Sequence, residues 1–128
     1  MTHKKATTNE LLRRIEENRN RRKKEHSIYS PYLDMEIPVK MIPLEEVLEM
    51  ISSVDINDFS EQMDRYKHII YEHCPMLHNK SLQSEEYLQP YDVVLDVFGN
   101  NLNAIAEFSE KIIDLYGLDD VGEKIKNS

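Results

Sequence analysis

The 128-residue sequence has little of the material from which several kinds of protein are built. Cys74 is the single cysteine, which excludes an intramolecular disulfide and a zinc site made of several thiolates. No apolar run approaches the roughly 18 residues that a membrane-spanning helix needs, and the amino terminus lacks the apolar stretch of a secretory signal. We therefore expect a soluble intracellular protein.

Glycine is also scarce, since only Gly99, Gly117 and Gly122 occur. So few glycines argue against an all-β fold with many tight turns. Gly99 and Gly117 follow helical patterns and are expected to end those helices, which leaves none for a phosphate-binding loop. The sequence contains no P-loop, no EF-hand calcium loop and no G-x-S-x-G elbow. We expect a protein that is not an enzyme and binds no cofactor.

The charge of the chain is unevenly distributed. Residues 1–26 contain nine Lys or Arg and four Glu, a formal charge of +5. Residues 27–128 carry a formal charge of -13, and the whole chain carries -8. A basic arm joined to an acidic body suggests an interaction tail or a nucleic-acid contact.

Residues 1–26 are predicted to form a basic N-terminal helix or arm. Thr7 and Glu10 have the spacing of a capping box, and an apolar group at helical spacing follows at Leu11, Leu12 and Ile15. Every residue from 16 to 25 is polar or charged. We expect packing to end near Ile15 and the rest of the helix to project from the body, because an isolated polar helix is marginal in water.

Residues 27–42 are predicted to form a β-hairpin. Met35, Ile37 and Val39 alternate with other residues, as in a half-buried strand. A preceding apolar group is expected to form the partner strand, with a turn near Leu33 and Asp34: Ile28, Tyr29, Tyr32 and Leu33. Pro31 and Pro38 each remove a backbone donor, so both strands should be short or lie at an edge.

Residues 43–128 are predicted to form a helical body, within a single domain overall. Pro43 suits the first turn of a helix, and Asp58 with Glu61 repeats the capping signature. Short helices are expected near residues 81–87 and after Asp119. The helical stripes are Leu44, Val47, Leu48 and Ile51; Phe59, Met63, Tyr66, Ile70 and Cys74; Tyr91, Val94, Leu95 and Phe98, where a strand is the alternative; and Leu102, Ile105, Ala106, Ser109, Ile112, Ile113 and Tyr116. The fold class is therefore mainly α with a small β-hairpin (α+β), a compact helical body with a projecting charged helix.

Three histidines at five-residue intervals, His68, His73 and His78, raise the question of a metal site. Five residues turn a helix by about 140° beyond a full circle, so successive side chains diverge instead of converging on one ion. Exposed or partly packed histidines are the preferred interpretation, and we expect no metal. Cys74 continues an apolar stripe and is expected in the core instead of acting as a nucleophile. The abundant carboxylates fit solvated helix faces and caps.

The basic arm is the remaining candidate for a binding function. Its arginines and lysines could neutralise phosphates, but Glu16, Glu17 and Glu25 interrupt them and the acidic body would repel a duplex. An arm that contacts an acidic or helical partner is the preferred hypothesis. The expected partner-binding residues are Leu11, Leu12, Ile15, Arg19 and Arg22.

The order of several segments resembles that of the XkdN-like tail assembly chaperones of Gram-positive phages and defective prophages. The similarity covers roughly residues 8–118 and is carried by the stretches ELLRR at 10–14, YLDMEIPVK at 32–40, IPLEEVL at 42–48, IIYEHCPML at 69–77 and PYDVV at 90–94, with VF at 97–98 and a closing helix. No one of these stretches is specific by itself, and the shared order is what carries the resemblance.

The resemblance implies a non-enzymatic protein of the bacterial cytoplasm. Chaperones of this kind coat the long helical tape-measure protein before the tail tube polymerises, and then leave, so they are absent from the mature virion. Further partners implied are the tail tube protein and a frameshift-extended form of the chaperone itself, and a homo-oligomer is possible in such systems. No family motif names binding residues.

Two other functions remain open at this stage. A permanent structural component of a phage tail or baseplate would be found stoichiometrically in purified particles. A small nucleic-acid-binding regulator would show salt-dependent binding to random duplex DNA through residues 1–26.

Overall fold

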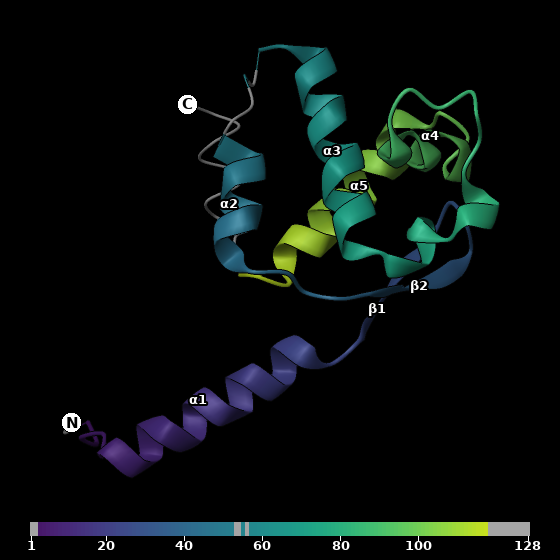
Figure 1. Cartoon of the computed structure of the whole chain (residues 1–128). Helices are drawn as coiled ribbons and strands as arrows, with labels where there is room; N and C mark the ends of the chain where they lie inside the picture. The colour runs from purple at the N-terminus through teal and green to yellow at the C-terminus, as the bar shows by residue number, and fades with distance from the viewer. Residues whose placement is uncertain (1–2, 53–54, 56, 118–128) are drawn as a thin grey trace.

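The computed structural model describes residues 3–52, 55 and 57–117, and it confirms the expected fold class of helices with one small hairpin. Figure 1 shows a helical body from which the first helix projects. The elements are α1 (Thr8–Lys23), β1 (His26–Ser30), β2 (Met35–Val39), α2 (Leu44–Ser52), α3 (Phe59–His73), the 3-10 helices η1 (Pro75–His78), η2 (Lys80–Leu82) and η3 (Pro90–Asp92), α4 (Val93–Val97) and α5 (Leu102–Asp114). The helix expected after Asp119 lies outside the described residues.

Helix α1 begins where the capping pattern predicts. The hydroxyl of Thr7 accepts a hydrogen bond from the backbone N–H of Glu10 at 3.2 Å, and the carboxylate of Glu10 pairs with Lys4 at 3.1 Å. None of the residues of α1 is buried. The expected packing as far as Ile15 is therefore wrong, because α1 leads away from the body along its whole length (Figure 1).

Strands β1 and β2 form an antiparallel pair in which Ile28 faces Ile37 and His26 faces Val39. The first strand stops at Ser30 because Pro31 has no N–H to donate, so the expected inclusion of Tyr32 and Leu33 in it is wrong. Both lie in the turn. Asp34 completes that turn with a φ of 53°, and its N–H donates to the Ser30 carbonyl at 2.8 Å.

The core lies mainly between α3 and α5, which are the longest helices of the body and lie against each other (Figure 1). The rings of Phe98 and Phe108 lie in this core with centroids 5.5 Å apart and planes tilted by 47°. The fully or nearly fully buried apolar residues are Ile28, Val39, Val47, Ile51, Tyr66, Ile69, Ile70, Cys74, Leu77, Val93, Val94, Phe98, Ala104, Ile105, Phe108 and Ile112. The helical stripes predicted for residues 91–98 and 102–116 both contribute to this core, and the helix replaces the strand alternative at Val93 and Val94.

Two of the predicted stripes are only partly correct. Helix α2 buries Val47 and Ile51, whereas Leu44 and Leu48 are 45% and 39% exposed, because among the described elements α2 packs mainly against α3. Phe59 is 67% exposed. It is the first residue of α3, at the end of the helix that extends beyond its neighbours in Figure 1.

The helix expected near residues 81–87 is not formed. Lys80–Leu82 is a single 3-10 turn, and Gln83 leaves helical geometry with a ψ of 146°. The side-chain amide of Gln83 donates to the Pro90 carbonyl at 3.2 Å, which closes the following loop on itself. Polar residues dominate this stretch, so it has no apolar face that could hold a helix against the body.

Candidate partner-binding surface

The residues expected to bind a partner lie together along one side of α1. At about 100° per residue, Leu11, Ile15 and Arg22 fall within roughly 40° of one another, and Leu12 and Arg19 lie beside them. The apolar members are half exposed, at 55% for Leu11, 54% for Leu12 and 44% for Ile15. We call these three side chains the apolar patch of α1. The structure therefore groups all five predicted residues on one accessible face.

The second half of α1 carries a high density of positive charge. From Asn18 to Lys24 five of seven residues are Arg or Lys and none is acidic. All of these residues are exposed. The cations at 21–23 lie in the last turn, where they interact favourably with the negative end of the helix dipole. This group stabilises α1 and also presents a basic surface; we call residues 18–24 the basic segment.

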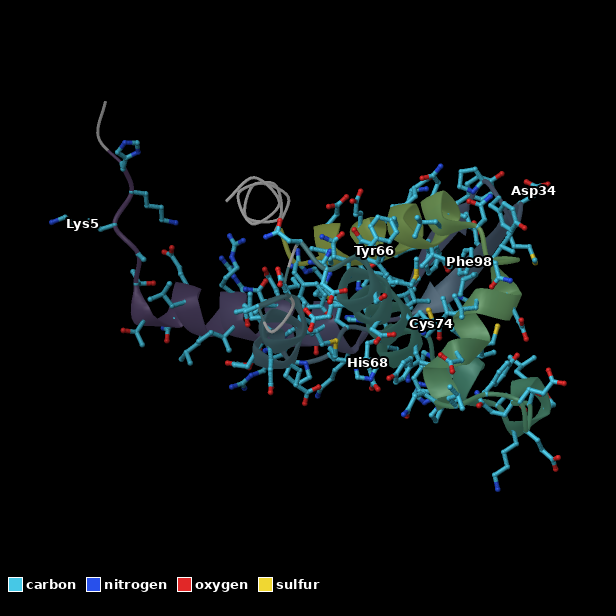
Figure 2. The ribbon with its side chains drawn as sticks, turned by 90° about the horizontal axis from the view of Figure 1, so that it is seen from above. Lys5, Asp34, Tyr66, His68, Cys74 and Phe98 are labelled. Atoms are coloured by element: carbon cyan, nitrogen blue, oxygen red, sulfur yellow. The ribbon has the colours of Figure 1, made fainter. Side chains whose placement is uncertain are left out.

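An open cleft of about 480 Å³ lies on the body between α2 and α3. Its lining residues are Glu46, Glu49, Met50, Glu61, Asp64, Arg65, His68, Glu72 and Tyr91. We call it the acidic cleft, because five carboxylates face a single guanidinium. Figure 2 shows His68, one of its residues, on α3 and at the margin of the body.

Sequence reasoning missed the acidic cleft, because each carboxylate taken singly fits a solvated helix face. A signal was present in the spacing. On α3, Glu61, Arg65, His68 and Glu72 follow one another at four, three and four residues, which places them on one side of the helix. Only packing against α2 shows that Glu46 and Glu49 face this same side.

Arg65 has an unusual environment in the wall of the acidic cleft. The residue is 8% exposed, and its Nε is buried with no hydrogen-bond partner within the described part of the chain. Its guanidinium carbon lies 4.8 Å from the centroid of the Tyr66 ring. A buried N–H without an acceptor costs free energy, so Arg65 is held in the cleft wall at the expense of one hydrogen bond.

The three histidines are separated, and each makes its own local contacts. The His68 ring packs edge-on against Tyr91 at 4.3 Å, and the His78 ring stacks on Tyr71 at 4.1 Å. His73 is fully buried and hydrogen-bonds to Tyr116. Among residues 3–52, 55 and 57–117, no group of three or more His, Cys, Asp or Glu is arranged to hold a metal ion.

Cys74 lies in the core, as its stripe predicts, and Figure 2 shows it inside the body near Phe98. Burial raises the pKa of the Cys74 thiol to about 12. At neutral pH the side chain is therefore a thiol and not a thiolate, which is the reactive form. Its environment suits packing and does not activate it as a nucleophile.

None of the helices in the described ranges combines the length and apolar content needed to cross a membrane. Comparison of the chain with models of protein families, with curated proteins and with solved structures finds no match.

Proposed function

We propose that this protein is a phage tail assembly chaperone that binds the tape-measure protein transiently and has no enzymatic activity. The observation that supports this proposal best is the state of α1, whose residues are all unburied although three of them are large and apolar. A helix of this kind gains most of its stability from a partner that covers its apolar side. The similarity in segment order to the XkdN-like chaperones supplies the identity of the partner.

The chemistry of the apolar patch suits a long helical partner. An amphipathic helix presents apolar residues three and four positions apart, and the patch offers Leu11 and Ile15 at the matching spacing. Full burial of the three half-exposed side chains contributes roughly 3 kcal/mol. This is weak for one contact, so each copy leaves the tape measure readily.

The acidic body supports the same proposal. Residues 27–128 carry a formal charge of -13, so bodies held close together on one tape measure repel one another and resist aggregation. The site of action in this proposal is the bacterial cytoplasm during tail assembly, with the tail tube protein and a frameshift-extended form of the chaperone as further partners.

Co-purification with the tape-measure protein tests the proposal. The double variant Leu12→Asp with Ile15→Asp places two charges in the apolar patch and is expected to reduce recovery of the complex at least about tenfold. The matched control is Leu82→Asp with Leu88→Asp, which alters residues that are 40% and 92% exposed on the body. Equal recovery of both folded variants with the tape measure would contradict the proposal.

The composition of purified particles separates the chaperone from a permanent tail or baseplate component. A chaperone that leaves before the tail is complete is expected to be missing from the mature particle by mass spectrometry. Finding the chain there at a fixed ratio to the tube protein would favour the structural role.

A further inference from the structure

We propose that the basic segment of α1 docks into the acidic cleft of a second copy of this chain. The proposal concerns residues 18–24 of one copy and the space between α2 and α3 of the next. It does not depend on the tape-measure proposal, which is argued from the apolar patch, although Arg19 and Arg22 belong both to the expected partner-binding residues and to the basic segment.

The basic segment lacks partners of its own. Arg19, Arg21, Arg22, Lys23 and Lys24 are all exposed. None of them forms an ion pair within the described residues; the ion pair of the arm joins Lys4 and Glu10 near its opposite end. Five cations on two turns of helix repel one another, so a negatively charged surface that accepts them lowers their electrostatic energy.

The acidic cleft, in turn, has carboxylates that no cation pairs with in the described residues. Asp64 pairs with Lys67 at 3.1 Å, and the Glu61 carboxylate accepts the Asp55 N–H at 2.8 Å. The other three carboxylates of the lining belong to Glu46, Glu49 and Glu72. None of them forms an ion pair with another described residue. Three uncompensated carboxylates lining one cleft favour a cationic occupant.

Arg65 makes a polypeptide a better occupant than a simple cation. The guanidinium of Arg65 lies in the cleft wall among the carboxylates, so an occupant that carries hydrogen-bond acceptors beside its positive charges suits the lining better than a bare cation. The basic segment also carries two side-chain amide oxygens: Asn18 precedes its cations, and Asn20 lies between Arg19 and Arg21. One segment therefore supplies both positive charges for the carboxylates and acceptors for the guanidinium in the cleft wall.

The dimensions agree with docking between copies. Seven helical residues span about 10 Å, which is within the roughly 14 Å length of the nine-residue α2. Within one chain, α1 joins β1 through Lys24 and Glu25 and runs away from the body (Figure 1). Arm-to-cleft docking uses different surfaces on the two copies, so it gives a closed dimer when two copies exchange arms, and otherwise a ring or an open chain.

Charge reversal on each side tests this interface by sedimentation velocity at about 50 mM and about 500 mM salt, across which ion pairs are progressively screened. One variant is Arg19→Glu with Arg22→Glu, and the other is Glu46→Lys with Glu49→Lys. We expect the unaltered protein to associate at low salt and dissociate at high salt. Each variant alone is expected to associate at least about tenfold more weakly.

Mixing the two variants distinguishes a specific interface from a general effect of charge. The acidic arm of the first variant fits the basic cleft of the second, and the two unaltered surfaces also fit, so the mixture is expected to regain association. Circular dichroism of each variant verifies that it is folded. The proposal is overturned if the unaltered protein is a monomer at low salt, if either folded variant associates normally, or if the mixture stays monomeric.

Discussion

The Nε2 atom of His73 lies 2.7 Å from the hydroxyl oxygen of Tyr116, which joins the end of α3 to the turn after α5 inside the body. The other ring nitrogen, Nδ1, lies 2.7 Å from the carbonyl oxygen of Ile69. Because a carbonyl only accepts, Nδ1 carries the proton and Nε2 accepts from the Tyr116 hydroxyl. The N–H of Ile42 donates to that same hydroxyl at 2.9 Å, so three distant segments meet at Tyr116.

The stability of the protein is expected to fall as the pH drops below about 6.5. Burial lowers the pKa of His73, and the Ile69 carbonyl and the charge of Glu72 oppose this only in part. The unfolded chain, with an ordinary histidine pKa, therefore binds a proton that the folded chain does not. The stabilisation is complete above the unfolded pKa and is lost by up to about 1.4 kcal/mol per pH unit below it.

Urea unfolding between about pH 7.5 and 5.5 measures this effect, in a range where most carboxylates stay ionised. NMR titration of the His73 ring in the folded protein gives its pKa directly, and the urea-unfolded chain supplies the reference. A folded His73 that titrates at or above the unfolded value would rule out this explanation.

Replacing Tyr116 by Phe is expected to lower the free energy of unfolding by about 1–3 kcal/mol. The substitution removes the hydroxyl and leaves the His73 Nε2 and the Ile42 N–H without their partner. Tyr29→Phe is the control, since Tyr29 is 46% exposed and its hydroxyl donates to Asp34 in the adjacent turn. Urea denaturation compares the two, and equal losses would show that the buried network adds nothing.

Gly99→Ala is expected to destabilise the protein by about 1–3 kcal/mol. Gly99 has a φ of +56°, which disfavours a Cβ, and that Cβ would also collide with the hydroxyl of Tyr32. Gly117→Ala is the matched control, because its φ is +69° and the space around it is open. Thermal unfolding should show the larger loss at Gly99. If the difference does not shrink in a Tyr32→Phe background, the collision is not its cause.

Deleting residues 1–24 is expected to change the free energy of unfolding of the body by less than about 0.5 kcal/mol. The arm buries none of its helical residues, and the hydrogen bond that the His26 ring donates to the Arg21 carbonyl is exposed. Urea unfolding followed by near-ultraviolet circular dichroism measures the body alone. A large loss of stability would mean that α1 packs on the body in solution.

Local pattern predicted much of the fold. The capping residues Thr7 and Asp58 bond to the first turns of α1 and α3 as expected. Gly117 takes the left-handed conformation expected after a helix. These features depend on contacts within about four residues, and for that reason a single sequence reveals them. The grouping of Leu11 with Ile15 follows from the same periodicity.

Exposure and distant pairing were decided only by the tertiary structure. Leu44 and Phe59 belong to clear helical stripes and are nevertheless exposed, because none of the described elements covers that side of them. The residues that form the acidic cleft and the His73–Tyr116 bond come from segments far apart in the chain. The sequence by itself determined the helices, the hairpin and the charged arm, since helical periods and caps are local. Which faces are buried, and which carboxylates meet, depends on how the helices pack, and no local pattern encodes that.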